Sequence, residues 1–570
     1  GKEEVIADSA WLKKAQELPV LRFLFRGSDE LGAVNLIKRV WHKAYLDQRL
    51  SHYHPGVQNL RRVCESFDSV PAVAAAPYAE CVRKLTATSG PLREWFVSTD
   101  GFPILASAAR GWFIGGTIAE WDSKTESDWF RLTDASAFYS EEWDSAIAAC
   151  QSEQGKLALG NARAALAALQ TQVGSKPARY YAVLALDGDE MGKWIAGEKS
   201  PAINNVMAPE AAKYFREHVK TVNVEAWLDS PRPVSPSFHL QFSEALANFA
   251  LYAARRIVEH HHGQLIYAGG DDVLAMLPAD EAFACAQGLR LAFQGHSRRR
   301  AGVPPASSEA SSPQTLPELY PALFADCPDG FVKLADKNKH NNGNWDQGAR
   351  RPVEPSWPLL VPGSRATVSV GLAIGHIREP LQDMVQEAQA AEKRAKAKPA
   401  TKVFDREKNQ EAEKLNEGWG RDALAVTLFK RSGETLRWGA RFDSPAFDLL
   451  AYFQPRYRSR LDDPKFVPPI SGKFPYRLAE LLGHYEARKE LTPELKDITA
   501  REFAHVVKQQ ADALPDGDKP VFQTLAETYL QHILGFQWKD DGGQTRCHAR
   551  PLAEFYHLFA VEAFIARRGE

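Results

Sequence analysis

Two adjacent carboxylates stand inside an otherwise apolar stretch. Asp271 and Asp272 follow Gly269 and Gly270 in YAGGDDVLAMLP, which spans residues 267–278. A buried ionised carboxylate is costly unless it is paired or binds a metal. The two glycines permit positive φ angles and let a ligand approach the backbone closely. Taken alone, the stretch fits either a metal site or a solvent-exposed turn that is capped by its aspartates.

A third carboxylate favours the metal site. Asp187 ends the apolar run of YYAVLALDGDEMGKW (180–194), as expected of a buried strand that delivers an acid at its edge. Converging carboxylates suit Mg²⁺ or Mn²⁺, and Mg²⁺ binds through one or two carboxylates plus substrate phosphates. Such a site suits phosphoryl or nucleotidyl transfer. Gly188 is predicted to border the nucleotide, and Asp189 either supports the ligands or is simply solvated.

Other polar residues are candidates for nucleotide binding. Lys393 and Lys396 crowd the end of a predicted helix over 379–396, where they either meet phosphates or form a solvated basic helix end. Ser235 and His239 open another predicted helix and could reach a nucleotide, although N-capping explains Ser235 equally well.

The elements that must position these residues follow from periodicity. The predicted order is a strand ending at Asp187, a helix from Ser235 to a stop at Gly263, strands on either side of the AGGDD turn, a helix over 279–294, a strand over 366–375, the helix over 379–396 and a last strand over 422–430. This order contains the β-α-β-β-α-β unit of a ferredoxin-like sheet, with one extra helix and strand, in an α+β fold whose helices cover one face. The histidines at 260–262 are predicted to be solvated residues at a helix end.

The flanking regions carry no recognisable chemistry. We expect three domains, a mostly helical region over 1–178, the α+β domain over 179–435 and a helical domain over 436–570. Two polar insertions, 295–318 and 333–358, are predicted to be surface loops of the middle domain.

Composition narrows the class of protein. The chain has 570 residues, 44% hydrophobic and 25% charged, with a net charge of −2, which argues against a free-standing nucleic-acid binder. Its six cysteines include no CxxC pair, so we predict no zinc site and no disulfide framework, and reduced thiols in a cytoplasmic protein. No apolar run approaches the ~18 residues of a membrane span.

The ordered motifs resemble a known family. LALDGDEMGKW, SPSFHLQFSEALANFALY, HGQLIYAGGDDVLAMLP, SVGLAIGH and GWGRDALAVTLFKRSGE are similar, in this order, to the Palm-domain large subunit of type III-B (Cmr) CRISPR effector complexes. The resemblance is strongest over 180–435. It implies synthesis of cyclic oligoadenylates from ATP when the guide RNA of the complex pairs with target RNA.

The resemblance also assigns roles to residues and partners. Asp271 and Asp272 would be the GGDD metal ligands, Asp187 the ligand from the first Palm strand, and Gly269 and Gly270 the turn against the nucleotide. The implied partners are a small helical subunit, a backbone subunit, CRISPR RNA and target RNA, with no membrane. Residues before 179 would hold a remnant of a first, non-catalytic Palm-like lobe.

Two departures from the family and two alternatives remain. No His-Asp dipeptide occurs, so we expect this chain to lack the N-terminal HD nuclease of many members, and the cysteines do not form the four-cysteine zinc site that many carry.

The first alternative is a catalytically silent scaffold or nucleotide-binding subunit of the same complex. The second is a stand-alone cyclase that makes cyclic dinucleotides from GTP.

Overall fold

The structure is a computed structural model. It describes residues 69–88, 90, 94, 135–220, 222–295, 315–335, 355–397, 400–405, 410–415, 418–460, 463, 465–485, 493–535, 537–539, 545–547 and 550–566. Most of the predicted N-terminal region and most of both predicted insertions lie outside these residues. The chain forms two compact units, the first made of residues 1–177 with 341–354, and the second of 178–340 with 355–568. The predicted three-domain division stays a prediction.

The described part of the first unit is helical. Its elements are α5 (Val70–Thr88), η3 (Ala135–Phe138), α9 (Ser140–Ala149) and α10 (Glu153–Val173). The α10 helix begins where the Ser152 hydroxyl accepts a hydrogen bond from the Gly155 amide, and it ends at Gly174, whose φ of 71° only glycine adopts without cost. Trp143 is fully buried and donates its indole N–H to the Ala137 carbonyl, 2.7 Å away.

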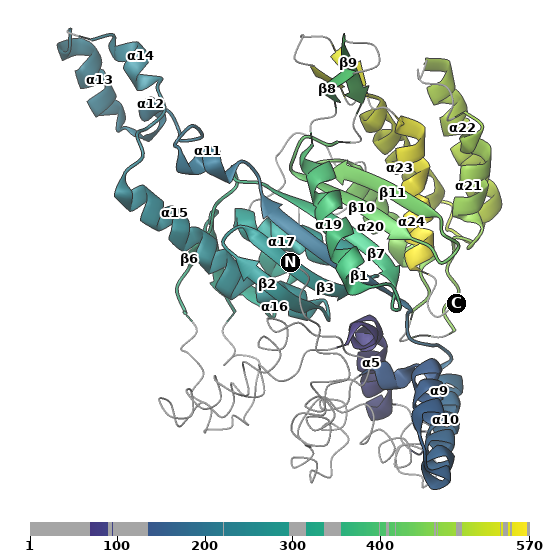
Figure 1. The fold of residues 1–570 in the computed structure, drawn as a ribbon. Helices are drawn as coiled ribbons and strands as arrows, with labels where there is room; N and C mark the ends of the chain where they lie inside the picture. Colours follow the sequence, from purple (N-terminus) through teal and green to yellow (C-terminus); the bar gives the residue numbers. More distant parts are fainter. Residues whose placement is uncertain are drawn as a thin grey trace, which may run out of the picture. The chain divides into compact units, whose positions relative to one another are not determined.

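The second unit is built on a six-stranded sheet (Figure 1). Its strands are β1 (Tyr180–Gly188), β2 (Gln264–Gly269), β3 (Asp272–Pro278), β7 (Val368–His376), β10 (Ala423–Phe429) and β11 (Thr435–Arg441). They lie in the order β11-β10-β7-β1-β3-β2, and only the β10–β7 pair is parallel. The order β7-β1-β3-β2 confirms the predicted ferredoxin-like unit. The strand β11 extends the sheet beyond the strand that we expected to be last.

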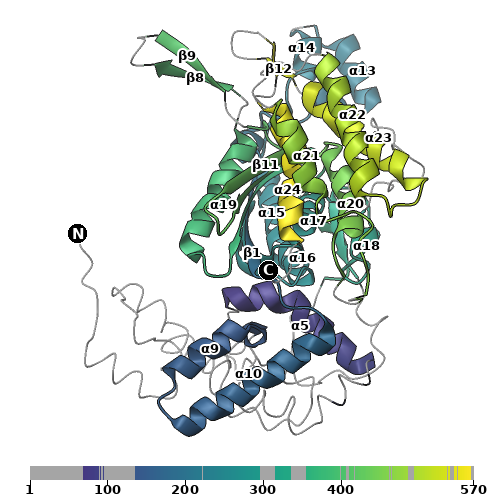
Figure 2. The same cartoon turned by 90° about the vertical axis from the view of Figure 1, so that its right-hand side faces the viewer.

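The helices between the strands cover both faces of the sheet. They are α15 (Pro236–Asn248), the π-helical η4 (Phe249–Ala254), α16 (Arg255–His260), α17 (Ala282–Gln294) and α19 (Leu381–Lys396). Leu184 of β1 and Ile257 of α16 share one core, whereas Ala391 of α19 packs with Ala423 and Ala425 of β10 in another. Figure 2 shows α19 on the opposite side of the sheet from α15, α16 and α17.

The expectation of helices on one face is therefore wrong for α19. Small residues make the second face available to a helix. A Cβ atom on Gly371 of β7 would clash with the Ala388 carbonyl and the Glu392 amide of α19. The backbone of the helix thus lies directly against the strand, on the face that carries Asp187.

The helix start at Ser235 is confirmed, but its end differs from the prediction. The Ser235 hydroxyl accepts a hydrogen bond from the Phe238 amide at 3.3 Å, and Pro236 takes the first helical position. The left-handed residue after the helix is His262, with φ of 54°, and not Gly263. Gly263 is instead required because a Cβ there would lie 2.8 Å from the Met276 carbonyl oxygen of β3.

The central histidine of the triplet is buried, which corrects the prediction of solvated histidines. His261 Nδ1 lies 2.8 Å from Glu281 Oε2, and Nε2 lies 2.9 Å from the hydroxyl of Tyr320. A buried imidazole needs partners for both nitrogens, and the short helix α18 (Leu316–Leu319) that precedes Tyr320 brings one of them. The last residues of the predicted loop over 295–318 thus belong to the helix α18.

Short elements complete the middle of the unit. They are α11 (Met191–Ile195), α12 (Ile203–Val206), α13 (Pro209–His218), α14 (Val224–Leu228), β4 (Phe324–Ala325), β5 (Phe331–Leu334), β6 (Leu359–Leu360), β8 (Ala400–Asp405) and β9 (Gln410–Leu415). In Figure 1, α11 to α14 extend away from the sheet. None of them was predicted from periodicity.

The C-terminal part of the unit is mainly helical. It contains α20 (Ala446–Tyr457), α21 (Phe474–Gly483), α22 (Pro493–Gln510), α23 (Asp518–Gly535) and α24 (Pro551–Ile565), with a two-stranded β12 (Gln537–Lys539) and β13 (Thr545–Cys547). The contacting rings of Phe453, Phe474, Phe522 and Phe559, in stacked, tilted and edge-on pairs, pack between the helices. Among the described helices, none is both long and apolar enough to cross a membrane.

A buried ion pair ties these helices to the sheet domain. Glu562 of α24 is fully buried and accepts two hydrogen bonds from Arg458, of which the Nη2–Oε2 contact measures 3.0 Å. Arg458 Nη1 also donates to the carbonyl of Asp280, in the connection between β3 and α17, at 2.9 Å. Burial opposes the charge of Arg458, but Glu562 outweighs this cost and keeps its pKa raised.

Glu562→Ala should leave Arg458 buried without its counterion. Breaking a buried pair from one side costs about 3–5 kcal/mol. We expect a loss of that size in the free energy of unfolding, measured by urea titration. Glu480→Ala, which breaks an exposed pair with Arg477, is the matched control and should change stability little. Equal stability of the two variants would contradict this role for Glu562.

Candidate functional site

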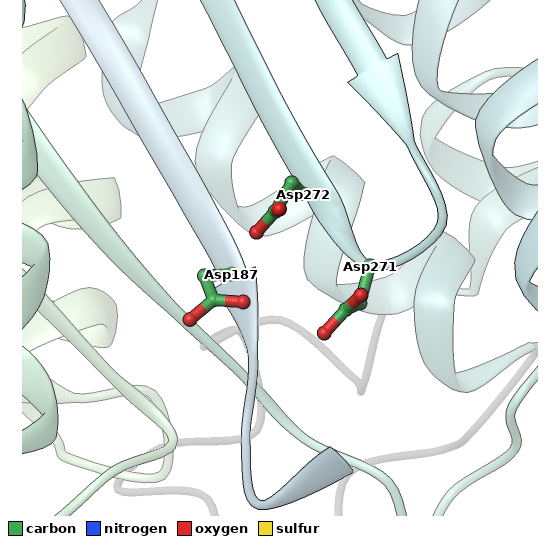
Figure 3. A group of neighbouring side chains, drawn as sticks. All are labelled: Asp187, Asp271 and Asp272. Carbon is green, nitrogen blue, oxygen red and sulfur yellow. The ribbon is translucent and has the colours of Figure 1, made fainter. Parts of the chain in front are cut away.

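Asp187, Asp271 and Asp272 meet at one end of the sheet (Figure 3). One carboxylate oxygen of each lies within 4.8 Å of the others, so the structure brings together the three acids that the sequence singled out. Asp187 is the last residue but one of β1, Asp272 begins β3, and Asp271 lies in the turn between β2 and β3. The antiparallel pairing of β1 with β3 makes the end of one strand adjacent to the start of the other.

The glycines around the acids each have a steric role. Gly270 has φ of 67°, which the tight β2–β3 turn requires. Gly269 is the residue of β2 that lies opposite Asp272 of β3 in the hairpin. A Cβ on Gly188 would lie 2.8 Å from the Cβ of Asp271 and 2.9 Å from its Oδ2. Gly188 therefore provides the space in which the Asp271 carboxylate lies beside β1.

The carboxyl groups are electrostatically strained without a cation. Burial raises the pKa of Asp271, and the charge of Asp272 adds to the shift, whereas a hydrogen bond from the backbone opposes it. Burial also raises the pKa of Asp272. Three carboxylates that share a small volume, with only oxygen ligands, fit a hard divalent cation such as Mg²⁺ or Mn²⁺.

Lys396 is the one predicted cation that reaches the aspartates. Its ammonium group forms an ion pair with Asp187, donates to the Gly188 carbonyl at 3.2 Å, and lies 2.9 Å from Glu392 Oε1. Burial lowers the pKa of Lys396 to about 8, and the charge of Arg421 acts in the same direction. The face of α19 that packs on β7 thus supplies a cation to the acidic group.

Glu392 was not predicted, although it stands one helical turn before Lys396. Glu392 is buried, and its pKa is raised to about 7. Burial is the main cause, and the charges of Asp189 and Asp272 add to the shift. The spacing of four residues is the signal that could have identified it, because such residues lie on the same helix face.

The other predicted nucleotide residues do not meet the aspartates. Lys393 and His239 are exposed, and the Ser235 hydroxyl is occupied by capping. Within the described residues, no hydrogen bond or ion pair joins any of the three to Asp187, Asp271 or Asp272. Their predicted roles stay predictions.

Asp189 is a buried supporting residue and is not solvated. Its Oδ1 accepts a hydrogen bond from the Ser369 hydroxyl at 2.8 Å, and its Oδ2 accepts one from Thr367 at 2.8 Å and one from the Asp422 amide at 3.0 Å. Burial raises its pKa, although these three donors oppose the shift. Asp189 therefore fixes the end of β1 against β7 and against the turn before β10.

Comparison with known proteins agrees with this geometry. Residues 180–308 match the family model described as Cas10/Cmr2, second palm domain. The CRISPR system Cmr subunit Cmr2 of Pyrococcus furiosus is 34% identical over 165 residues, which cover 28% of this chain and 18% of that protein. The CMR subunit Cmr2 of Saccharolobus solfataricus is 40% identical over 90 residues, which cover 16% of this chain and 8% of that protein. The aligned segments thus span less than a fifth of either relative.

Two solved structures are similar in fold to this chain. The type III-B Cmr-beta apo state has a TM-score of 0.50 at 13% identity, with 98% of this chain and 55% of that chain covered. Cmr-beta bound to cognate target RNA has a TM-score of 0.54 at 14% identity, with 99% and 54% covered. The present chain therefore spans about half the length of these structural relatives.

The sheet order and the acidic group at its edge define a palm domain. Residues 180–308 within it are similar to the second palm domain of the Cas10/Cmr2 family. The resemblance to the large subunit of type III-B complexes is confirmed for this part of the chain.

Gly188→Ala should weaken metal binding by displacing Asp271. The added methyl group would occupy the space of that carboxylate, so we expect at least a tenfold loss of Mn²⁺ affinity, measured by electron paramagnetic resonance titration. Gly192→Ala is the matched control, because no atom lies within 4 Å of a Cβ there. Unchanged Mn²⁺ affinity in Gly188→Ala would contradict the predicted role of Asp271 as a ligand.

Proposed function

We propose that this chain is the large subunit of an RNA-guided type III-B antiviral complex and that its palm domain makes cyclic oligoadenylates from ATP. The observation that carries the proposal is the convergence of the Asp187, Asp271 and Asp272 carboxylates in a second palm domain of the Cas10/Cmr2 family. One solved relative is bound to target RNA, which supports target RNA as the activating partner. The proposed partners are CRISPR RNA, target RNA, a small helical subunit and a backbone subunit.

The proposed reaction is a nucleotidyl transfer between ATP molecules. The 3′-oxygen of one adenosine forms a bond to the α-phosphorus of another ATP, the bond to the bridging oxygen of the β-phosphate breaks, and pyrophosphate leaves. The proton of the 3′-hydroxyl passes to water. Repetition of the step followed by ring closure gives a cyclic product.

The residues of the site have separable tasks in this reaction. Asp187, Asp271 and Asp272 would hold Mg²⁺ or Mn²⁺, which when bound would offset phosphate charge and favour ionisation of the 3′-hydroxyl. Lys396 neutralises part of the carboxylate charge and lies where it can turn toward an anionic ligand. Gly269 and Gly270 keep the turn free of side chains next to the acids. Asp189 holds the end of β1 in place.

Turnover by the assembled complex tests the proposal. Wild-type complex, Asp271→Asn/Asp272→Asn complex and an Asp512→Asn/Asp516→Asn control, which alters two exposed aspartates, would be incubated with labelled ATP or GTP, with and without target RNA. We expect cyclic oligoadenylate only from ATP with target RNA, normal rates in the control and at least a thousandfold loss in the site variant. Absence of product from the wild type under every condition would favour a silent scaffold. Product from GTP without target RNA would favour a stand-alone cyclase.

The same site variant should be more stable than the wild type when metal is removed. A carboxyl group with a raised pKa in the folded state stabilises the fold at low pH and loses that contribution as pH rises through the folded pKa. In EDTA at neutral pH we therefore expect a higher melting temperature for Asp271→Asn/Asp272→Asn, and a smaller difference near pH 4. A lower melting temperature at neutral pH would show that the aspartates do not repel one another.

Mg²⁺ with ATP should instead make the wild type more stable than the Asp271→Asn/Asp272→Asn variant. A ligand that binds only the folded state raises the melting temperature. We expect Mg²⁺ and ATP together to stabilise the wild type and not the Asp271→Asn/Asp272→Asn variant, in differential scanning fluorimetry. Equal stabilisation of both proteins would place the nucleotide and metal elsewhere.

A further inference from the structure

The turn before β10 has an unusual backbone. Gly420, Arg421 and Asp422 have φ angles of 73°, 81° and 48° in succession. A left-handed conformation is unfavourable for a residue other than glycine. Arg421 and Asp422 therefore need surrounding structure that holds them in this conformation, and such strain is concentrated at functional sites.

The C-terminus of α19 fixes the first half of the turn. The Gly420 amide donates to the Ala397 carbonyl at 3.0 Å, and the Arg421 amide donates to the Ala395 carbonyl at 3.1 Å. These bonds satisfy carbonyl groups that a helix end leaves without partners. They also set the Arg421 backbone next to the helix end that carries Lys396.

A bidentate ion pair fixes the second half. Arg290 of α17 donates from Nε and Nη2 to the two carboxylate oxygens of Asp422, at 2.6 and 2.8 Å, and both side chains are mostly buried. The Asp422 amide donates to Asp189, which itself follows the metal-site strand β1 by one residue. The turn is thus locked to the same residues that position Asp187.

The contacts of the Arg421 side chain with neighbouring residues do little to offset this backbone strain. Its Nε is buried and has no hydrogen-bond partner among the described residues. Its Nη1 lies 3.6 Å from Glu190 Oε1, which is beyond a normal hydrogen bond. Glu190 is already paired with Lys193 at 2.7 Å and Lys199 at 2.5 Å, so it does not depend on Arg421.

We propose that Arg421 binds the polyphosphate of the nucleotide beside Lys396, and that Arg290 and Asp422 are positioning residues for it. The inference rests on the proposed function and adds a residue to that site. A guanidinium group has five N–H donors in a fork that matches phosphate oxygens, and Arg421 has donors to spare next to the acidic group. Its side chain is 39% exposed, so a ligand can reach it.

A nucleotide would explain the arrangement of charge. The aspartates repel a bare phosphate, whereas a metal-bound triphosphate brings its own cation and presents its terminal phosphates to side chains beyond the carboxylates. The Arg421 amide donates to the carbonyl of Ala395, the residue before Lys396, so the two cationic residues lie at the same helix end. An anionic ligand beside this helix end would account for both cations.

Substitution by asparagine separates ligand binding from stability. Asparagine tolerates the left-handed conformation better than arginine, so Arg421→Asn should keep or raise the melting temperature of the chain while it removes the guanidinium group. In the assembled complex with Mg²⁺, we expect at least a tenfold weaker affinity for ATP and for inorganic tripolyphosphate, measured by isothermal titration calorimetry, and an unchanged affinity for AMP. Arg421→Lys should recover part of the loss, and Arg437→Asn, at an exposed position on β11, should bind like the wild type.

The positioning residues give a second, independent readout. Arg290→Gln leaves Arg421 in the chain but releases the turn, so we expect weaker ATP and tripolyphosphate binding with unchanged AMP binding and a raised KM for ATP. Equal ATP affinity of Arg421→Asn and wild type would overturn the inference and leave the proposed function standing. A wild-type complex that binds neither ATP nor tripolyphosphate would overturn the proposed function and the inference together.

Discussion

Repulsion among the carboxylates of Asp187, Asp271 and Asp272 is the constraint on which the site depends. Like charges confined within a few ångströms favour protonation unless a cation joins them, and here both strand pairing and the β2–β3 turn force them together. Lys396 supplies one positive charge from α19, which leaves a formal charge of −2 for the group. This residual negative charge is the basis of the proposed metal site.

The surrounding fold keeps the acids from separating. Glycine at 188 lets Asp271 approach β1, and glycine at 371 lets α19 lie against β7, so that Lys396 reaches Asp187. Asp189 then joins β1, β7 and the turn before β10 through three hydrogen bonds. Each contact opposes the relaxation that electrostatic repulsion alone would cause, which is the physical meaning of a preorganised site.

The C-terminal helices extend this framework beyond the sheet. Arg458 and Glu562 link α20 and α24 to the connection between β3 and α17, and Arg290 of α17 holds Asp422 next to Asp189. Through α17, these two sets of polar contacts connect α24 with the residues around the site.

The sequence by itself determined the local elements and the acids. Short apolar runs, the Ser235–Pro236 helix start and the Gly-Gly turn specify strands, helix and hairpin through neighbouring residues, so the ferredoxin-like order could be predicted and Asp187 could be joined with Asp271 and Asp272. The tertiary structure decided the face on which α19 packs, the burial of Asp189 and His261, and the strained turn at Arg421. These depend on contacts between residues tens to hundreds of positions apart, which no local periodicity encodes.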